Sequence, residues 1–319
     1  MFSYTFEEWL LMFYIYCFLG WCFESTYVSL KSKHWVNRGF MRGPYLPLYG
    51  SGAILMLVVS KPFVDNLWLT YIAGCIAATL LELVTGVVME RLFKIRYWDY
   101  SYLRFQYKGY ICLSSTLAWG VLTILMTRVL HRPVESLVLS MPEGVMNVVV
   151  LVWTVIMTWD FTLSFKAALD LKNILIKLED TKKEFEELHE RLKDIVEQAN
   201  EQLQAAADER SNRLESIREE LADVRENIQA GLTANFEVRI SKLRELENKI
   251  DSLDDVKEEY KQWRKKFYEN QKKRVQALNF NDKFKLHHLF DNPTMRSEQF
   301  SDVIDEIKKY IRDMKDEEE

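Results

Sequence analysis

Charge is scarce in the first half of this 319-residue chain. Residues 1–165 hold 12 Lys or Arg and 10 Asp or Glu, whereas the remaining residues hold 30 and 37. This division predicts an apolar domain followed by a charged part that is exposed to water. The net charge of −5 comes from the second half, and this acidic balance argues against nucleic acid as a partner.

Motifs for metal binding and catalysis are also lacking. The four cysteines form no CxxC pair and no cluster with histidine, so the sequence predicts no metal site, and nothing in it calls for a cofactor. It contains no Walker A loop and no HExxH motif, which makes an enzyme the least favoured function. Residues 1–30 have no Lys or Arg, unlike the start of a signal peptide, so the first apolar segment should be retained.

Five apolar segments predict a bundle of membrane-spanning helices. They cover about residues 9–30, 46–64, 67–93, 110–130 and 144–165. Most are long enough to cross ~30 Å of hydrocarbon at ~1.5 Å per residue. The second segment is the weakest, because Gly and Pro interrupt its start, and it could be a re-entrant or discontinuous helix. No histidine lies within the five segments.

The basic residues of the connecting loops predict the orientation. The first and third loops are rich in Lys and Arg, whereas the second has one and the fourth has two. Because loops rich in basic residues stay in the cytoplasm, the N-terminus is predicted to be outside. With five spans, the charged second half is then cytoplasmic.

Carboxylates inside the apolar segments are the main candidate functional residues. Glu24 lies in the first segment and Glu82 in the middle of the third, where small residues recur every four positions. A carboxylate that faces lipid costs several kcal/mol, so both should face protein or water. They could be structural, paired with an Arg or with backbone N–H groups, or they could line a site for a cation, a proton or a lipid headgroup. Glu90, beside Arg91, is a further candidate for which a structural role is favoured.

Two loops supply the remaining candidate ligand-binding residues. The stretch NRGFMRGPYLPLYGSGA combines Gly and Pro with Arg38 and Arg42, which could bind an anion such as a lipid phosphate or could mark an ordinary cytoplasmic loop. Residues 96–120 alternate aromatic and basic side chains, as expected of a segment on the cytoplasmic membrane surface. Asp99 in this stretch indicates a turn, or could hold a neighbouring Arg.

Several of these motifs, in this order, resemble one family. They are Gly20 with Glu24, then RGFMRGPYLPLYGSG, Glu82 and Glu90, WDYS, Gly109, and Trp119 with Gly120. They are similar to the putative ABC-transporter type IV family, the CmpB-like permease proteins, over about residues 5–165. The resemblance implies a protein of the bacterial cell membrane with a permease function and no established substrate. Since this chain has no ATPase motif, a separate subunit would have to supply the ATPase.

The second half predicts a cytoplasmic helical rod. From Leu171 to Ala199 the apolar residues follow a 3-4 spacing, with Thr181 as the one exception. Heptads in a charged background predict a coiled coil over residues 166–275. A break around Gly231 leaves two alternatives, a hairpin of two helical arms or an extended rod.

Residues 276–319 predict a linker and a last amphipathic helix. The adjacent His287 and His288 cannot share one helical face as metal ligands. The final helix needs a surface to cover, which could be the coiled coil, a partner or a membrane. Its apolar residues are Phe300, Ile304, Ile307 and Ile311.

The sequence therefore predicts an all-α protein with a polytopic membrane helix bundle over residues 1–165. A coiled-coil rod or helical hairpin over 166–275 and the terminal segment 276–319 follow. The favoured function is a permease-like subunit of a transport system. The alternative is a non-transporting scaffold, and an intramembrane enzyme is third. The expected partners are membrane lipids, a separate ATPase subunit, and a second copy or a cytoplasmic protein on the coiled coil.

Overall fold

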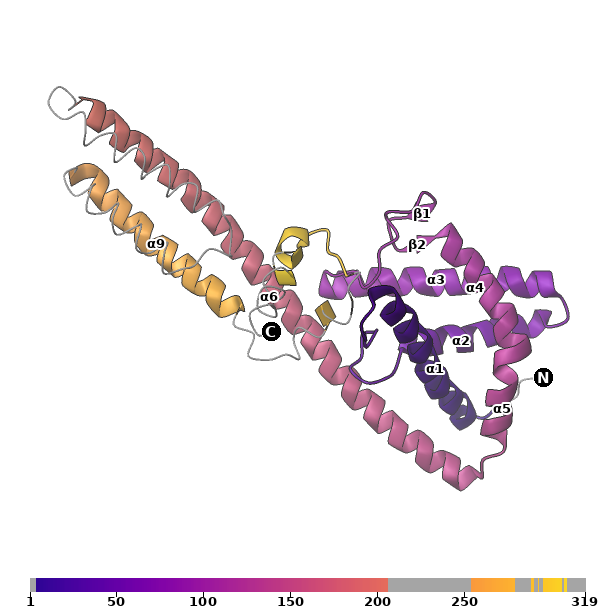
Figure 1. Ribbon diagram of the computed structural model, residues 1–319. Coiled ribbons are helices and arrows are strands. Elements are labelled where there is room, and N and C mark those ends of the chain that lie inside the picture. The colour runs from indigo at the N-terminus through magenta and orange to yellow at the C-terminus, as the bar shows by residue number, and fades with distance from the viewer. Residues whose placement is uncertain are drawn as a thin grey trace. The chain divides into compact units, whose positions relative to one another are not determined.

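The computed structural model is mainly helical and divides into two units (Figure 1). It describes residues 4–205, 254–278, 288–289, 292, 295–305 and 307–308. The first unit, Met1–Asn173 with Asp282–Gln299, is called the membrane unit here. The second, Ile174–Asn281 with Phe300–Glu319, is called the charged unit. The short stretch Asp282–Gln299 thus belongs with the apolar half of the chain.

Four stretches of helix are long and apolar enough to cross a membrane. They are α1 (Phe6–Ser32), α3 (Leu67–Phe93), the continuous run Leu113–Leu139, and Glu143–Ala199 within α6 (Glu143–Ala205). The remaining predicted span is α2 (Pro47–Ser60), followed by the 3-10 turn η1 (Lys61–Phe63). At 14 residues, α2 is about 21 Å long, which is less than the hydrocarbon thickness of ~30 Å. Four of the five predicted segments therefore form helices that are long and apolar enough to cross a membrane, and the second segment, α2, does not.

The fourth crossing is longer than the apolar segment 110–130 indicates. Helix α4 (Leu113–Leu125) continues through the π-helical stretch η2 (Met126–Leu130) into α5 (His131–Leu139). Pro133 lies in α5 and has no N–H to donate, and the wider turn just before it accommodates this loss. The sequence-based expectation that no histidine lies in a span is therefore wrong, because His131 is buried inside this crossing. The nearby arginines had lowered the local hydropathy.

Local side chains explain where the long helices begin and end. Thr5 and Glu8 form a capping box at the start of α1, and the Asn66 side chain accepts the first free N–H groups of α3. At the other ends, Lys33 and Lys94 adopt left-handed backbone conformations that stop the two helices.

Small residues let neighbouring helices approach closely. A Cβ atom on Gly50 of α2 would lie 2.9 Å from the Phe13 carbonyl oxygen of α1. A Cβ atom on Gly74 of α3 would overlap Thr123 of α4. The predicted stripe of small residues on the third segment therefore faces another helix, which is how membrane helices gain packing contacts without a hydrophobic driving force.

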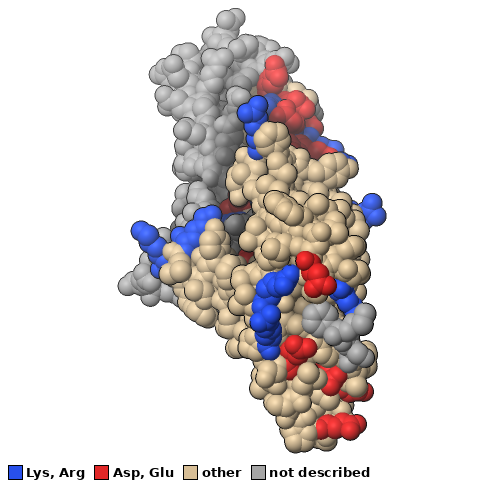
Figure 2. Space-filling model, turned by 90° about the vertical axis from the view of Figure 1, so that its right-hand side faces the viewer, with Lys and Arg blue, Asp and Glu red and all other residues tan. Residues whose placement is uncertain are grey.

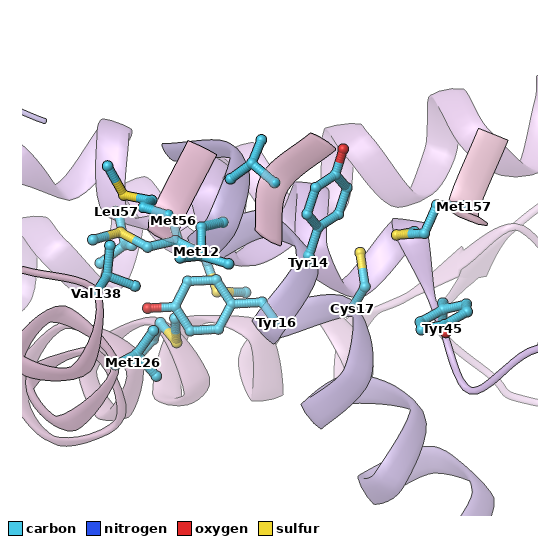
Figure 3. Packing of buried hydrophobic residues seen from close by; sticks show 14 of the residues in the cluster. Met12, Tyr14, Tyr16, Cys17, Tyr45, Met56, Leu57, Met126, Val138 and Met157 are labelled. Carbon is cyan, nitrogen blue, oxygen red and sulfur yellow. The ribbon is translucent and has the colours of Figure 1, made fainter. Parts of the chain in front are cut away.

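Apolar side chains from most of these helices form one core in the membrane unit (Figure 3). Met12 of α1 and Leu57 of α2 lie fully buried near its centre. The exterior is also apolar, and a broad uncharged area dominates the face shown in Figure 2. Exposed residues of α6 such as Val148, Leu151 and Trp159 contribute to this apolar exterior, as a lipid-facing surface requires.

A β-hairpin links α3 to α4 (Figure 1). Strands β1 (Gln106–Tyr107) and β2 (Ile111–Cys112) are antiparallel, with Tyr107 paired to Ile111. The turn between them places Lys108 and Gly109 at φ 50° and 73°. The alternation of aromatic and basic residues had indicated a surface segment here, but not a hairpin.

In the charged unit, the second part of α6 and helix α9 (Asp254–Leu278) are antiparallel neighbours. The Trp263 indole donates to the Leu188 carbonyl at 2.7 Å, and the Asn270 amide donates to the Thr181 carbonyl at 2.9 Å. The later residue of α9 pairs with the earlier residue of α6, so these two helices run antiparallel, as the hairpin alternative predicts. The coiled coil itself remains a prediction, and the break around Gly231 lies outside the described residues.

Two features of the sequence pattern gain an explanation in the charged unit. Thr181, the exception in the heptad spacing, is buried, its hydroxyl donates to the Leu178 carbonyl at 2.9 Å, and its own carbonyl accepts the Asn270 amide. The last helix finds its surface within the chain, since Lys182 of α6 pairs with Asp302 at 2.7 Å. Its buried apolar residues are Phe300, Val303, Ile304 and Ile307.

Candidate functional site

Glu24 lies near the end of α1 and faces α2. Its Oε2 accepts the Tyr49 hydroxyl at 2.7 Å, and its Oε1 lies 3.4 Å from Nε of Arg38. Gly20, one turn earlier, makes this approach feasible, because a Cβ atom there would lie 2.6 Å from Cγ of Tyr49. The Arg partner that the structural interpretation required is therefore present.

Arg38 is buried and has a partner at each part of its guanidinium group. Besides its contact with Glu24, it donates from Nη2 to the Tyr97 carbonyl at 3.0 Å and from Nη1 to Oδ1 of Asn292 at 2.6 Å. Its backbone N–H donates to the Ser25 hydroxyl at 3.1 Å. These contacts hold Arg38 in one position between three separate segments of the chain.

Glu82 lies in the middle of α3 and is only 5% exposed. Its Oε1 accepts the Tyr100 hydroxyl at 3.0 Å, and its Oε2 accepts the Trp119 indole at 3.0 Å and the Ser115 hydroxyl at 3.3 Å. All three donors are uncharged, and no ion pair in the described part of the chain involves Glu82. A buried charge normally has a charged partner, so this carboxylate is unusual.

Tyr100 connects the surroundings of the two carboxylates. Burial raises its pKa, and the negative charges of Glu82 and, more weakly, of Glu24 raise it further. The hydroxyl of Tyr100 therefore stays protonated at neutral pH and remains a donor. The rings of Tyr49 and Trp119 meet edge to face at 6.4 Å, which joins the Glu24 side to the Glu82 side. We call Glu24, Tyr49, Glu82, Tyr100 and Trp119 the carboxylate site.

Glu90 belongs to a different cluster, two turns along α3 from Glu82. Its Oε2 accepts Nε of Arg96 at 2.8 Å and the Tyr110 hydroxyl. Burial opposes the charge on Arg96, but hydrogen bonds to Glu90 and Glu298 and their negative charges outweigh it and raise the Arg96 pKa. These contacts agree with the structural role that the sequence favours for Glu90.

Asp99 and Arg42 also make local contacts. Asp99 accepts the backbone N–H of Ser101 at 2.9 Å and its hydroxyl at 2.7 Å, which is the expected turn. The arginine it contacts is Arg296, at 3.6 Å. The Arg42 backbone N–H donates to Asp160 at 3.3 Å, so the irregular loop before α2 is tied to α6. These contacts tie Asp99 and Arg42 to partners other than Glu24 and Glu82.

A family comparison covers most of the membrane unit. Residues 11–165 match the model of a family described as putative ABC-transporter type IV, and we call these residues the type IV region. The resemblance to this family that the sequence indicates is therefore confirmed for residues 11–165. Searches of curated proteins and of solved structures found no match. All five residues of the carboxylate site lie inside the type IV region, whereas Asn292 and Glu298 lie outside it.

A segment beyond the type IV region completes the membrane unit, and the sequence interpretation missed it. His288 is buried, with Nδ1 3.1 Å from the Tyr97 hydroxyl and Nε2 3.0 Å from the Ser164 carbonyl oxygen. Asn292 is also buried and donates to the Gly39 carbonyl at 3.1 Å. The stretch had been predicted as a linker, because its polar residues show no helical period and their partners are far away in sequence.

A second polar cluster surrounds the buried His131. The Tyr16 hydroxyl lies 2.7 Å from Nδ1 of this histidine, and the Tyr4 hydroxyl lies 2.9 Å from Nε2. Tyr4 also donates to Glu135, one turn after His131. The signal in the sequence was the pair His131 and Glu135 at a four-residue spacing, which becomes visible only once the helix is known to continue.

Proposed function

We propose that the chain is a permease-like membrane subunit of a transport system, and that the carboxylate site binds or passes a cation, the proton included. The observation that carries this proposal is the environment of Glu82. It is a buried acid in the middle of α3, with three uncharged donors and no cationic partner among the described residues. Ionisable groups in this position commonly mark ion or proton pathways.

Glu24 and Glu82 differ in whether a cationic side chain balances their charge. Arg38 lies beside Glu24 and balances its charge, so Glu24 does not need a further cation as a partner. Glu82 has no such balance, so its ionised form gains most from a proton or a metal cation that enters the site. A bound cation would replace the missing charge partner, and Tyr100, Ser115 and Trp119 would keep the carboxylate oriented for it.

The match of residues 11–165 to the type IV family supports the transport part of the proposal. The sequence contains no nucleotide-binding motif, so ATP hydrolysis would come from a separate ATPase subunit. We expect that subunit to co-purify with the full-length chain from a mild detergent.

A second candidate function is a membrane scaffold, and one observation favours it. The charged unit has its own buried aromatic stack of Tyr260, Trp263 and Phe267. A solvated tail does not need such a core, whereas a module that presents a surface to cytoplasmic proteins does. In this alternative the membrane unit serves as the anchor.

The test compares Glu82→Gln with Glu143→Gln in the purified full-length protein. Gln keeps the shape of the side chain but removes the charge, and Glu143 is an exposed carboxylate of the same unit. Thermal unfolding in detergent is recorded with and without Na⁺, K⁺, Mg²⁺ or Ca²⁺, and over a range of pH. A ligand that binds only the folded state raises the unfolding temperature.

We expect a cation or a lower pH to stabilise the wild type and Glu143→Gln, but not Glu82→Gln. The Glu82→Gln protein should keep its basal unfolding temperature and its co-purifying partners, and should fail to restore the phenotype of a strain that lacks the gene. Equal responses in all three proteins would refute the cation site. Full restoration by Glu82→Gln would favour the scaffold.

A further inference from the structure

The loop between α3 and α4 ends in a tip, residues 101–109, that exposes three aromatic rings. Tyr102, Phe105 and Tyr107 are 74%, 65% and 53% exposed. None of them belongs to the core of the membrane unit. Three large rings that are solvated together on one short loop are costly in water, and such patches usually mark an interaction surface.

The same tip carries positive charge and no negative charge. Arg104 and Lys108 are both exposed, and the sequence has no Asp or Glu between Asp99 and Glu135. Each cation lies over a ring of the tip, with Arg104 at 5.7 Å from the Phe105 centroid and Lys108 at 5.9 Å from that of Tyr107. The surface therefore combines apolar rings and cations within a few ångströms.

The hairpin holds the tip in a defined shape. The Gly109 N–H donates to the Gln106 side chain at 2.6 Å, and its carbonyl accepts the Tyr100 N–H at 2.9 Å. The Leu113 N–H donates to the Phe105 carbonyl at 2.8 Å, which fixes the tip to the first residue of α4. A surface that is already formed loses little conformational entropy when it binds.

Both ends of the tip are tied to helices that cross the membrane. Helix α3 ends at Phe93 and α4 begins at Leu113, directly after β2. The tip therefore stays close to the level where the crossings leave the hydrocarbon. Aromatic rings favour that headgroup level, and Lys and Arg bind the phosphates of anionic lipids there.

We infer that the tip is a docking surface for anionic lipid headgroups, with Tyr102, Phe105 and Tyr107 among the headgroups and Arg104 and Lys108 on their phosphates. The charge complementarity and the tether to two crossings favour a lipid surface over a protein partner. This inference does not depend on the proposed transport function. Each basic residue should strengthen the contact about fivefold when anionic lipid is present.

The experiment measures hydrogen exchange of the full-length protein in nanodiscs. One set of discs contains phosphatidylcholine alone, and the other contains phosphatidylcholine mixed with phosphatidylglycerol. Peptides that cover the tip report how accessible its backbone amides are to water. We expect exchange of the tip to be several-fold slower in the anionic discs, while peptides from the charged unit exchange equally in both.

Two variants and a control decide the origin of that difference. Arg104→Gln with Lys108→Asn should abolish the dependence on lipid charge and leave exchange in neutral discs unchanged, since Asn tolerates the positive φ at this turn. Tyr102→Ser removes the most exposed ring without touching the strands and should speed exchange in both discs. Lys31→Gln with Lys33→Gln makes the same change in charge at the C-terminal end of α1 and should alter nothing at the tip.

Equal exchange of the wild-type tip in both kinds of disc would overturn the proposal and leave the surface to a protein partner. Slower exchange in anionic discs that survives the loss of Arg104 and Lys108 would also overturn it, because the lipid charge would then act elsewhere.

Discussion

Arg38 is the residue through which distant parts of the chain meet. One guanidinium group contacts Glu24 in α1, the Tyr97 carbonyl after α3, and Asn292 in the C-terminal segment. Removing one partner of a buried, hydrogen-bonded charge costs more than the contact itself is worth, because the remaining group is left unsatisfied. The carboxylate site is thereby linked to residues outside the type IV region.

We predict that Asn292→Ala destabilises the full-length protein by about 1–3 kcal/mol, because Arg38 and the Gly39 carbonyl both lose a buried partner. Thermal unfolding in detergent measures the effect. The matched control is Asn173→Ala, an exposed position in α6 where Ala is the better helix former. The same unfolding temperature for both variants would show that the C-terminal segment does not support the membrane unit.

How far the sequence predicts a residue's role depends on how far away its partners are. Glu24 and Glu82 stand out because a carboxylate in an apolar run is costly, and that cost is visible locally. The partners of Arg38 and His288 lie up to 254 residues away, and no local pattern encodes them. The pairing of Arg96 with Glu298, 202 residues away, was hidden for the same reason.

At the scale of elements, α2 shows how a short helix can take part in a membrane bundle. It is buried at Met56 and Leu57, and Gly50 lets α1 approach closely. The sequence identified it as the weakest span because Gly and Pro interrupt its start. The sequence did not indicate that the fourth crossing extends through His131, because charged residues there lower the hydropathy. The π-helical turn η2 keeps the helix continuous through this stretch.

Two glycines of α2 give a matched test of this packing. Gly50→Ala should lower the unfolding temperature in detergent, because the new methyl group would press on the Phe13 carbonyl oxygen at 2.9 Å and on Cys17. Gly52→Ala should be neutral or stabilising by up to about 1 kcal/mol, because its nearest neighbour would be at 3.9 Å and Ala favours helix. If both variants were equally stable, close α1–α2 packing would not be needed.

For the whole molecule, the orientation in the membrane remains a prediction from the basic loops. We expect a membrane-impermeant maleimide to label Ser3→Cys on intact cells and Lys265→Cys only after permeabilisation. The unmodified chain, with its four native cysteines, gives the background. Labelling of both positions on intact cells, or of neither, would contradict an outside N-terminus with a cytoplasmic charged unit.

The contact between Arg38 and Asn292 also sets an order of events during biosynthesis. The two residues are separated by 254 positions, so the ribosome releases the second about 13–50 s after the first, at ~5–20 residues per second. During that interval the helices of the membrane unit lie in the bilayer before Asn292, a buried partner of Arg38, has been synthesised. The last contacts of the membrane unit therefore form only after residues 174–281 of the charged unit have been synthesised.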